Sequence, residues 1–425
     1  MSCCAQGHIE RRVFVRAGAL ALVGLGLDPI FLTRAAYAVR RPVGPSARPP
    51  TLICVFQRGA VDGLNMIVPH GDTHYYRERP RIAVPRPGAP GGALDLDGHF
   101  GLHPVLAPLV PLYRSGALAL VHAVGSPDAT RSHFDAQDYM ETGTPGRKAT
   151  QDGWINRHLA HAAEHRDTPF RGVAMGQQLP LALRGSAPAL AIDNLEAFGL
   201  RARPAARDRL ERAFEDMYAG SATGVVATSS AEAFEAIRRL RAADPARHQP
   251  EHGAEYPRSP FGQTLRQLAQ LIKADLGLEI GFADLGGWDT HANQGAAEGQ
   301  LAQRLRDLGT GLAAFATDLG ERMADVVVLT MSEFGRTVAE NGNSGTDHGH
   351  GTAMMVLGGG TRGGKVYGTW PTLDPAARYD GRDLAVTTDF RDLFGEVIRG
   401  HLGPADLSAV FPGHAPSGRS LGLFG

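Results

Sequence analysis

Cysteine is scarce in this sequence of 425 residues, which contains only Cys3, Cys4 and Cys54. Two of the three lie within the first four residues, so the remaining chain has one thiol and no internal disulfide framework is expected. A zinc site built from cysteines is excluded for the same reason. Any bound metal would have to be held by His, Asp, Glu, Asn or backbone oxygens.

Neither sign of charge is in excess, because 43 Lys and Arg face 44 Asp and Glu and the formal net charge is -1. This balance does not support binding to nucleic acid or an anionic membrane through overall charge, and no nucleic-acid partner is expected. Aromatic residues make up only 7%, whereas 54 Gly and 28 Pro indicate many tight turns and long loops. With 43% hydrophobic and 20% charged residues, the composition is typical of a globular protein.

The sequence also lacks a long apolar run. The most apolar stretch, Ala17–Leu32, is interrupted by Asp28 and Pro29, so no transmembrane anchor is expected. A buried helix is one interpretation of this stretch. Its flanks favour another, a cleavable export signal.

Arg11 and Arg12 precede the apolar stretch, and Ala36-Tyr37-Ala38 follows it as a small-x-small cleavage site. The Arg-Arg-x-Phe pattern resembles the twin-arginine signal, which the twin-arginine translocase reads. We therefore expect residues 1–38 to be a twin-arginine signal peptide. Residues 39–425 would form a single domain that is periplasmic or secreted.

Short apolar runs alternate with helical patterns along the rest of the chain. The runs that predict buried strands are Thr51–Phe56, Ala117–Gly125, Leu278–Leu285, Val326–Met331 and Ala353–Gly360. The stretches that predict helices are Phe134–Gly143, Phe261–Gly277, Leu301–Met323 and Thr388–Gly403, with a charge-rich peripheral helical region at about 194–257. This alternation predicts an α/β fold, a mostly parallel sheet with helices on both faces.

Potential metal ligands concentrate in two glycine-rich segments, Phe282–Gly295 and Ser332–Gly351. The candidates there are Asp289, His291, Glu333, Asp347, His348 and His350. Both segments follow predicted strands, and sites in such sheets form outside the carboxyl ends of the strands. Carboxylates mixed with several imidazoles favour zinc or manganese over calcium or magnesium. The alternative is that each residue only caps a loop or lies on the surface.

The sequence has no G-x-S-x-G elbow, so a Ser-His-Asp hydrolase is not supported. Thr130, Ser132 and His133 instead lie at the start of a predicted helix, where backbone N–H groups attract anions. A hydroxyl placed there beside a divalent cation could act as a nucleophile, although Ser132 could equally be a helix cap.

Three arginines, Arg58, Arg131 and Arg336, flank these loops. They could clamp an anionic ester, or each could be an ordinary partner in a structural ion pair.

Several motifs together resemble a known family. The stretches "FQRGAVDGLN", "SHFDAQDYMETG", "GGWDTHANQ", "SEFGRT" and "GTDHGHGTAMMVLGGG" are similar to those of exported bacterial proteins of the domain-of-unknown-function 1501 family. That family resembles the alkaline phosphatase and sulfatase superfamily of one-metal or two-metal α/β hydrolases. The resemblance implies an alkaline-phosphatase-like fold. With no cysteine at the nucleophile position, it does not imply the formylglycine chemistry of most sulfatases.

The resemblance also implies roles for individual residues. Asp62 would match the metal-binding aspartate after the first strand, and Ser132, or else Thr130, would match the nucleophile. Asp289 and His291 would match a ligand pair, with a spacing shorter by two. The strand-end Asp-His-Gly would fall either on Glu333-Phe334-Gly335, which lacks the imidazole, or on Asp347-His348-Gly349, and His350 would be the last ligand.

The sequence therefore predicts a metal-dependent hydrolase of phosphate or sulfate esters with a small anionic substrate. His133 is a candidate general acid, and Ser132 or a water is the candidate nucleophile. The alternative is a non-catalytic exported binding or assembly protein that retains the fold. The missing imidazole at Phe334 favours this alternative, and the density of His and Asp in the loops disfavours it.

Overall fold

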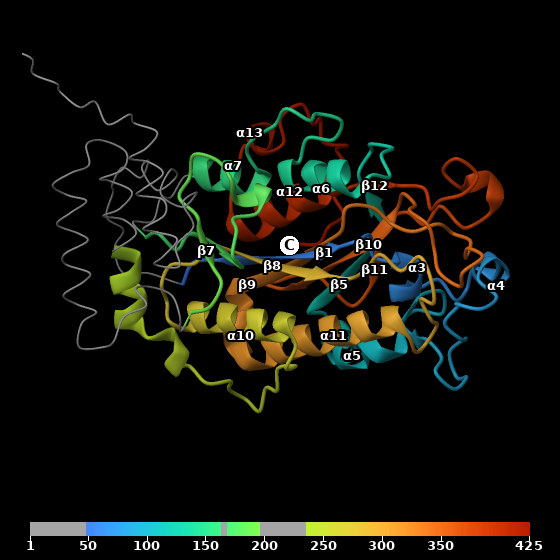
Figure 1. Cartoon of the computed structure of the whole chain (residues 1–425), viewed down its shortest axis with the longest axis horizontal. Coiled ribbons are helices and arrows are strands. Elements are labelled where there is room, and N and C mark those ends of the chain that lie inside the picture. The colour runs from blue at the N-terminus through green and yellow to red at the C-terminus, as the bar shows by residue number, and fades with distance from the viewer. Residues whose placement is uncertain (1–47, 163–167, 196–234) are drawn as a thin grey trace, which may run out of the picture.

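The computed structural model describes residues 48–162, 168–195 and 235–425 (Figure 1). The predicted signal peptide, 1–38, lies outside the described residues, and so does most of the predicted peripheral region at 194–257. Within that region, residues 235–243 are helical and Pro245–Arg247 form a 3-10 turn. No helix among the described residues is long and apolar enough to cross a membrane.

A nine-stranded sheet forms the centre of the molecule. β10 is antiparallel to both of its neighbours, and the other pairings in the sheet are parallel. In spatial order the strands are β11 (Val366–Tyr367), β5 (Leu118–Gly125), β10 (Thr352–Gly358), β9 (Val326–Met331), β1 (Thr51–Arg58), β8 (Ile280–Gly286), β6 (Gly172–Met175) and β7 (Leu190–Ile192), with β12 (Thr388–Asp389) beside β5. The predicted mostly parallel sheet is confirmed.

Helices cover both faces of this sheet (Figure 1). On one face lie α6 (His133–Thr142), α7 (Trp154–His161), α12 (Phe390–Val397) and α13 (Leu407–Val410). On the other lie α5 (Val110–Arg114), α10 (Pro260–Lys273) and α11 (Gln300–Leu319). The α/β architecture predicted from the sequence is therefore confirmed.

Shorter elements fill the connections. They are α3 (Gly63–Met66), α4 (Thr73–Glu78), a small sheet of β2 (Ile67–Val68), β4 (Gly101–Leu102) and β3 (Leu94–Asp95), 3-10 turns at Pro104–Leu109, Leu181–Leu183, Gly320–Asp325 and Pro375–Ala377, and a π-helical turn at Ile398–Leu402.

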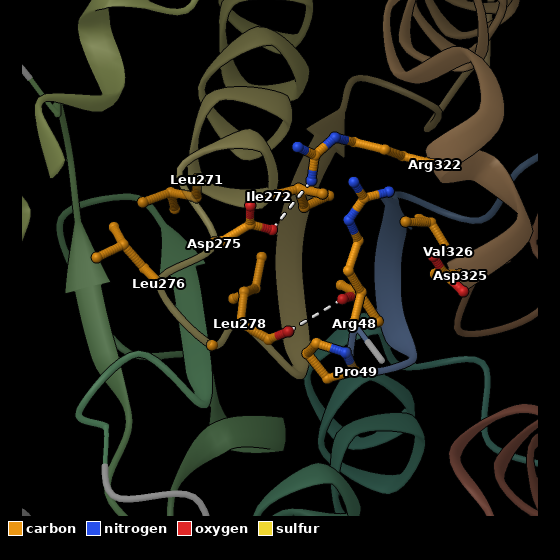
Figure 2. Close-up of a pocket in the computed structure, with 12 residues that line it drawn as sticks. Arg48, Pro49, Leu271, Ile272, Asp275, Leu276, Leu278, Arg322, Asp325 and Val326 are labelled. Atoms are coloured by element: carbon orange, nitrogen blue, oxygen red, sulfur yellow. Dashed lines mark hydrogen bonds and ion pairs between the residues drawn. The ribbon is translucent and has the colours of Figure 1, made fainter. Parts of the chain in front are cut away.

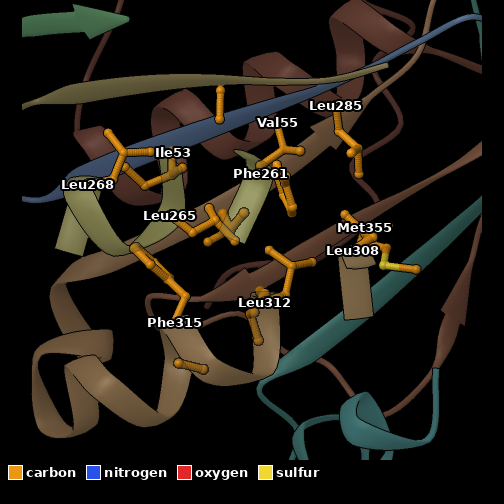
Figure 3. Close-up of a cluster of buried hydrophobic side chains, with 14 of the residues drawn as sticks. Ile53, Val55, Phe261, Leu265, Leu268, Leu285, Leu308, Leu312, Phe315 and Met355 are labelled. Atoms are coloured by element: carbon orange, nitrogen blue, oxygen red, sulfur yellow. The ribbon is translucent and has the colours of Figure 1, made fainter. Parts of the chain in front are cut away.

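The apolar face of α11 shows why the helix packs where it does. Four leucines and a phenylalanine recur at helical spacing along one side of it and are fully buried. These residues are Leu301, Leu305, Leu308, Leu312 and Phe315. Leu308, Leu312 and Phe315 lie near Leu265 and Phe261 of α10 (Figure 3). Burial stabilises the fold by about 1.5–3 kcal/mol for each such side chain.

β1 and β8 end at the same level, where Arg58 pairs with Gly286, and β9 ends two residues earlier, where Met331 pairs with Phe56. β10 runs the other way, so its first residue, Thr352, lies opposite Val124 near the end of β5. The loop that precedes β10 therefore reaches the same edge of the sheet as the loops that follow β1, β5, β8 and β9. The two glycine-rich segments that carry the candidate ligands meet at this edge.

His122 on β5 is a buried histidine with a structural role. Its Nε2–H donates to the carbonyl of Ile67 on β2 at 3.0 Å, and its Nδ1 accepts from the N–H of Ala123 at 2.9 Å. Both ring nitrogens are thus satisfied only in the neutral form. Burial lowers the pKa of His122 to about 4.

Candidate metal centre

Three histidines and one aspartate converge at the carboxyl edge of the sheet. His133 is the first residue of α6, Asp289 and His291 lie in the loop after β8, and His348 lies just before β10. We call these four residues the histidine–aspartate cluster. They come from three segments of the chain, and more than 150 residues separate His133 from Asp289. The sheet brings these segments together at one point.

The contacts within the cluster centre on Nε2 of His348. It lies 3.0 Å from Nε2 of His133, 2.9 Å from Nε2 of His291 and 3.2 Å from Oδ1 of Asp289. Oδ1 of Asp289 also lies 2.9 Å from Nε2 of His291 and 3.5 Å from Nε2 of His133. Four potential ligand atoms thus meet in one small volume.

The outer nitrogen of each imidazole faces an oxygen that can only accept a hydrogen bond. Nδ1 of His133 donates to Glu333 Oε1 at 2.9 Å, and Nδ1 of His291 donates to Asp347 Oδ1 at 3.2 Å. Nδ1 of His348 donates to the carbonyl of Arg131 at 2.8 Å. In the neutral form of each ring the proton therefore lies outward, and the Nε2 lone pair points into the cluster.

Hydrogen bonds between the rings cannot satisfy all of the inner Nε2 atoms. His348 offers a single lone pair at Nε2, so only one of the two flanking imidazoles can donate to it. Burial lowers the pKa of His348, with further contributions from the charges of His133 and Arg336, which disfavours a cationic His348. A shared cation would satisfy all three lone pairs and the carboxylate together.

The donor set fits a borderline divalent metal. Two imidazole nitrogens on one tetrahedral zinc, at about 2.0–2.1 Å each, lie roughly 3.3 Å apart, close to the separations found here. His133, Asp289 and His348 alone place one ligand atom each within 4.8 Å of one another. Imidazoles with one carboxylate suit zinc or manganese, whereas calcium and magnesium prefer all-oxygen sites.

Solvent reaches the cluster. The side chains of Asp289 and His291 are 44% and 43% exposed, whereas those of His133 and His348 are 23% exposed. A cation held here would be accessible, as it must be if a small molecule is to approach it.

Arg336 holds the aspartate of the cluster. Its side chain is fully buried, and its Nη1 donates to Asp289 Oδ1 at 2.8 Å. Burial acts to raise the pKa of Asp289, but the hydrogen bond and charge of Arg336 outweigh it and hold that pKa below its usual range. Asp289 is therefore an ionised candidate ligand, held by Arg336.

Glu333 is buried and accepts several hydrogen bonds, one of them from His133. Its Oε1 accepts from the N–H of Gly59 at 2.8 Å, from His133 at 2.9 Å and from Gln137 Nε2 at 2.9 Å. Burial acts to raise the pKa of Glu333, but these bonds, that of His133 first, hold the pKa below its usual range. The bond to Glu333 in turn raises the pKa of His133.

Glycine lets the ligand loops pack backbone against backbone. Gly335 donates its N–H to the carbonyl of His350 at 2.9 Å, and a Cβ at Gly335 would overlap the carbonyl of Gly351. A Cβ at Gly345 would likewise overlap the backbone of His291. Close contact between loops therefore explains the glycines at these two positions.

Two of the predicted ligands lie apart from the cluster. Asp62 is fully buried, and its Oδ2 accepts from Arg79 Nη1 at 2.7 Å and Gln294 Nε2 at 2.6 Å. His350 is buried and stacks on Tyr379, with ring centroids 4.2 Å apart. Two others, Glu333 and Asp347, contact the outer nitrogens of the rings. In this structure all four therefore have roles other than joining the cluster.

The predicted nucleophiles lie at the rim. Ser132 is the exposed N-cap residue of α6, but its side chain makes no capping hydrogen bond, which differs from the expected cap. Thr130 Oγ1 accepts from the N–H of Ser132 at 3.2 Å. His133, a candidate general acid, points into the cluster instead. A coordinated imidazole has no proton at Nε2 to give to a leaving group.

Each of the three flanking arginines is paired with carboxylates. Arg131 binds Asp383 at 2.7 Å and Asp380 at 3.1 Å, and Arg336 binds Asp289. Arg58 binds Glu141 at 2.8 Å and Asp284 at 2.6 Å. Their predicted role as an anion clamp stays a prediction, and the ion-pair alternative describes the contacts found.

Phe334 follows Glu333 in the segment after β9. It is buried, and its ring centroid lies 5.0 Å from that of His133 and 5.1 Å from that of His348. Its ring therefore packs against two imidazoles of the cluster. Sequence reasoning did not predict this role, nor those of Gln137 and Gln294, because none of these residues is itself a ligand type.

A cavity of about 80 Å³ lies elsewhere (Figure 2). It is lined by the first residues of β1 and β9, Thr51 and Val326, together with Arg48, Leu278 and Arg322. It thus opens at the amino ends of the strands, on the edge opposite the cluster, and is separate from the candidate metal centre.

The fold and the cluster define an α/β protein with a candidate metal centre at the carboxyl edge of its sheet. The chain belongs to the family described as protein of unknown function DUF1501, whose model matches residues 115–397. This confirms the family recognised from the sequence motifs. No curated protein matches the chain.

The chain is similar to several solved structures, and two of them show how low the identity is. The lipoteichoic acid synthase LtaP from Listeria monocytogenes is 8% identical, with a TM-score of 0.31 over 80% of this chain and 71% of its own. The phosphonate monoester hydrolase SpPMH from Silicibacter pomeroyi is 11% identical, with a TM-score of 0.29 over 88% of this chain and 78% of its own. Likenesses this weak carry no conclusion about activity.

Proposed function

We propose that the chain is an exported, metal-dependent hydrolase of small phosphate or sulfate esters. The observation that carries the proposal is the convergence of three Nε2 lone pairs on one ionised carboxylate, at a place that solvent reaches. Such a group of hydrogen-bond acceptors is best stabilised by a divalent cation, zinc or manganese before calcium or magnesium.

The residues of the cluster and their hydrogen-bond partners would have different roles. When bound, a divalent cation supplies Lewis acidity toward an ester oxygen and toward water. His133, His291, His348 and Asp289 would hold it. The carbonyl of Arg131, with the carboxylates that contact the other two rings, keeps each Nδ1 protonated.

Ser132 is the proposed nucleophile, with water as the alternative. Its hydroxyl lies at the N-cap of α6, directly before His133, and is not used for capping. Ser259, at the same position of α10, does cap, because its Oγ accepts from the N–H of Gly262 at 3.0 Å. An uncommitted hydroxyl beside the helix N-terminus is well placed to attack an anionic ester.

The first test is metal analysis of the purified protein, with His291→Ala and His348→Ala as variants. Both should lose the stoichiometric metal, whereas His161→Ala, an exposed histidine at the end of α7, should retain it. A wild-type protein without metal, or variants that retain it, would overturn the proposal.

The second test is turnover of aryl phosphate monoesters, diesters and sulfates by the metal-loaded protein. Ser132→Ala should keep the metal and lose turnover if the serine attacks. If it retains both, water is the nucleophile.

A second candidate function is a non-catalytic exported binding or assembly protein. It is favoured by the ion pairs of Arg58, Arg131 and Arg336, which leave these cations neutralised by carboxylates. Two results together would support this candidate over the hydrolase. The protein would have full metal occupancy but turn over no ester, and neither phosphate nor vanadate would compete at the site.

The export part of the proposal rests on the sequence alone. Replacing Arg11 and Arg12 by lysine should leave the precursor in the cytoplasm, and cell fractionation with an antibody against the chain measures this. Unchanged export of the variant would contradict the twin-arginine route.

A further inference from the structure

Gln294 links two of the segments that build the candidate metal centre to the loop after β1. It lies in the loop after β8 and is fully buried. Its Oε1 accepts from Thr290 Oγ1 at 2.8 Å and from Thr346 Oγ1 at 2.9 Å. Its Nε2 donates to Asp62 Oδ2, in the loop after β1, at 2.6 Å. One carboxamide therefore contacts the loops after β1, β8 and β9.

The direction of these hydrogen bonds is fixed by chemistry. Asp62, paired with Arg79, can only accept, so the NH₂ group of Gln294 must face it and the carbonyl must face the threonines. Thr346 then gives its one hydroxyl hydrogen to Gln294. Its remaining lone pair can accept from Arg336, whose Nε lies 3.1 Å away.

Arg336 depends on this chain of bonds for its position. Its guanidinium is buried, and among the described residues its side-chain partners are Thr346 through Nε and Asp289 through Nη1, while Nη2 has none there. Loss of the bond to Thr346 would leave Asp289 as its sole side-chain partner. The bonds run without a break from Asp62 through Gln294 to the aspartate of the cluster.

We propose that Gln294 is a positioning residue for the metal centre. It acts through Thr346 and Arg336 to fix the ligand oxygen of Asp289, and so sets the affinity for the cation. This rests on the proposed metal centre and deepens it. Asp62 would then also act on the metal centre without contacting it, because the charge of Asp62 selects the orientation of the Gln294 carboxamide.

The test is a double-mutant cycle on metal affinity. Gln294→Met keeps the length of the side chain and removes the carboxamide, and Arg336→Met removes the guanidinium. Affinity for zinc is measured by competition with a chromogenic chelator. Each single variant should bind zinc 10–100-fold more weakly, as is typical when a group that orients a ligand is lost. The double variant should be no weaker than Arg336→Met alone, because Gln294 acts through that arginine.

A buried carboxamide elsewhere provides the control. Asn156 on α7 is buried and bridges the carbonyls of Leu183 and Ala187 at 2.8 Å each. Asn156→Leu should lower the melting temperature and leave zinc affinity unchanged, which separates positioning from general stability. If Gln294→Met does not fold, Thr346→Val, which is nearly isosteric, breaks the same chain of bonds and should weaken zinc binding alike.

Three results would overturn the proposal: affinity of Gln294→Met within threefold of wild type, single effects that multiply in the double variant, or an equal loss of affinity in Asn156→Leu. The readout is binding and not turnover, so a catalytically inactive protein still tests it. A wild-type protein that binds no zinc would refute the metal centre itself, and that result is known before any variant is made.

Discussion

Replacement of Glu333 by glutamine isolates the effect of one buried charge on the metal centre. The Oε1 of Glu333 accepts three hydrogen bonds, and its Oε2 accepts one, from Ser332 Oγ at 3.1 Å. In the variant the amide oxygen can keep the three bonds, and the NH₂ group can donate to Ser332. The serine hydroxyl then donates to the carbonyl of Gln57, which is 2.8 Å away. The geometry survives, and only the charge is lost.

The expected cost follows from what that charge does. The bond to Glu333 is the largest cause of the raised pKa of His133, so it makes this imidazole a stronger base and a better ligand. Loss of such an orienting carboxylate typically weakens metal binding 10–100-fold, or about 1.4–2.7 kcal/mol. We expect a loss in this range for Glu333→Gln, with zinc and manganese both affected.

The assay is competition with a chromogenic chelator at a fixed pH near neutral. Glu141→Gln is the matched control, because Glu141 is also buried but pairs with Arg58 and contacts no ring of the cluster. Affinity of Glu333→Gln within threefold of wild type, or an equal loss in Glu141→Gln, would refute the reasoning.

Three further predictions follow from single contacts. His133→Ala should lose the metal while Phe134→Ala, which removes an 88% exposed side chain one residue on, should retain both metal and melting temperature. Gly335→Ala should lower the melting temperature and the metal affinity because its Cβ meets backbone, whereas Gly342→Ala, in the same loop but with nothing within 4 Å, should change neither. His122 has a pKa of about 4 in the fold against about 6.5 when unfolded, so the unfolded chain binds more protons between these values. Its contribution, about 3 kcal/mol, should be lost as the pH falls from about 6.5 to 4, and urea unfolding of His122→Asn should show a weaker pH dependence there.

The long buried strands could be predicted because burial on both faces leaves a continuous apolar run. β1 and β9 are of this kind, and every residue from Val326 to Met331 is buried. β6 and β7, with four and three residues, are too short to give such a pattern and were not predicted. The direction of β10 was also beyond prediction, because a run buried on both faces has the same composition in either direction.

The ligand assignments were harder to predict, because a ligand is defined by where its ring or carboxylate points. His291 and His348 join the cluster since oxygens from other segments hold their Nδ1 atoms outward. The partner of His133 is Glu333, 200 residues away in sequence, and no local pattern connects them. The resemblance implied a metal role for Asp62, and in the structure its carboxylate binds a buried arginine 17 residues on.

Acids and imidazoles are dense in two short loops for a physical reason, which is that not all of them need to be ligands. Each neutral imidazole in the cluster needs an acceptor at its outer nitrogen, or its inner lone pair is not fixed. Neighbouring residues of an extended segment point to opposite sides, so Asp347 reaches the outer nitrogen of His291 while His348 enters the cluster. The loops therefore carry the candidate ligands and the groups that orient them side by side. Removal of an orienting acid should weaken metal binding without abolishing it, whereas removal of a ring should abolish it.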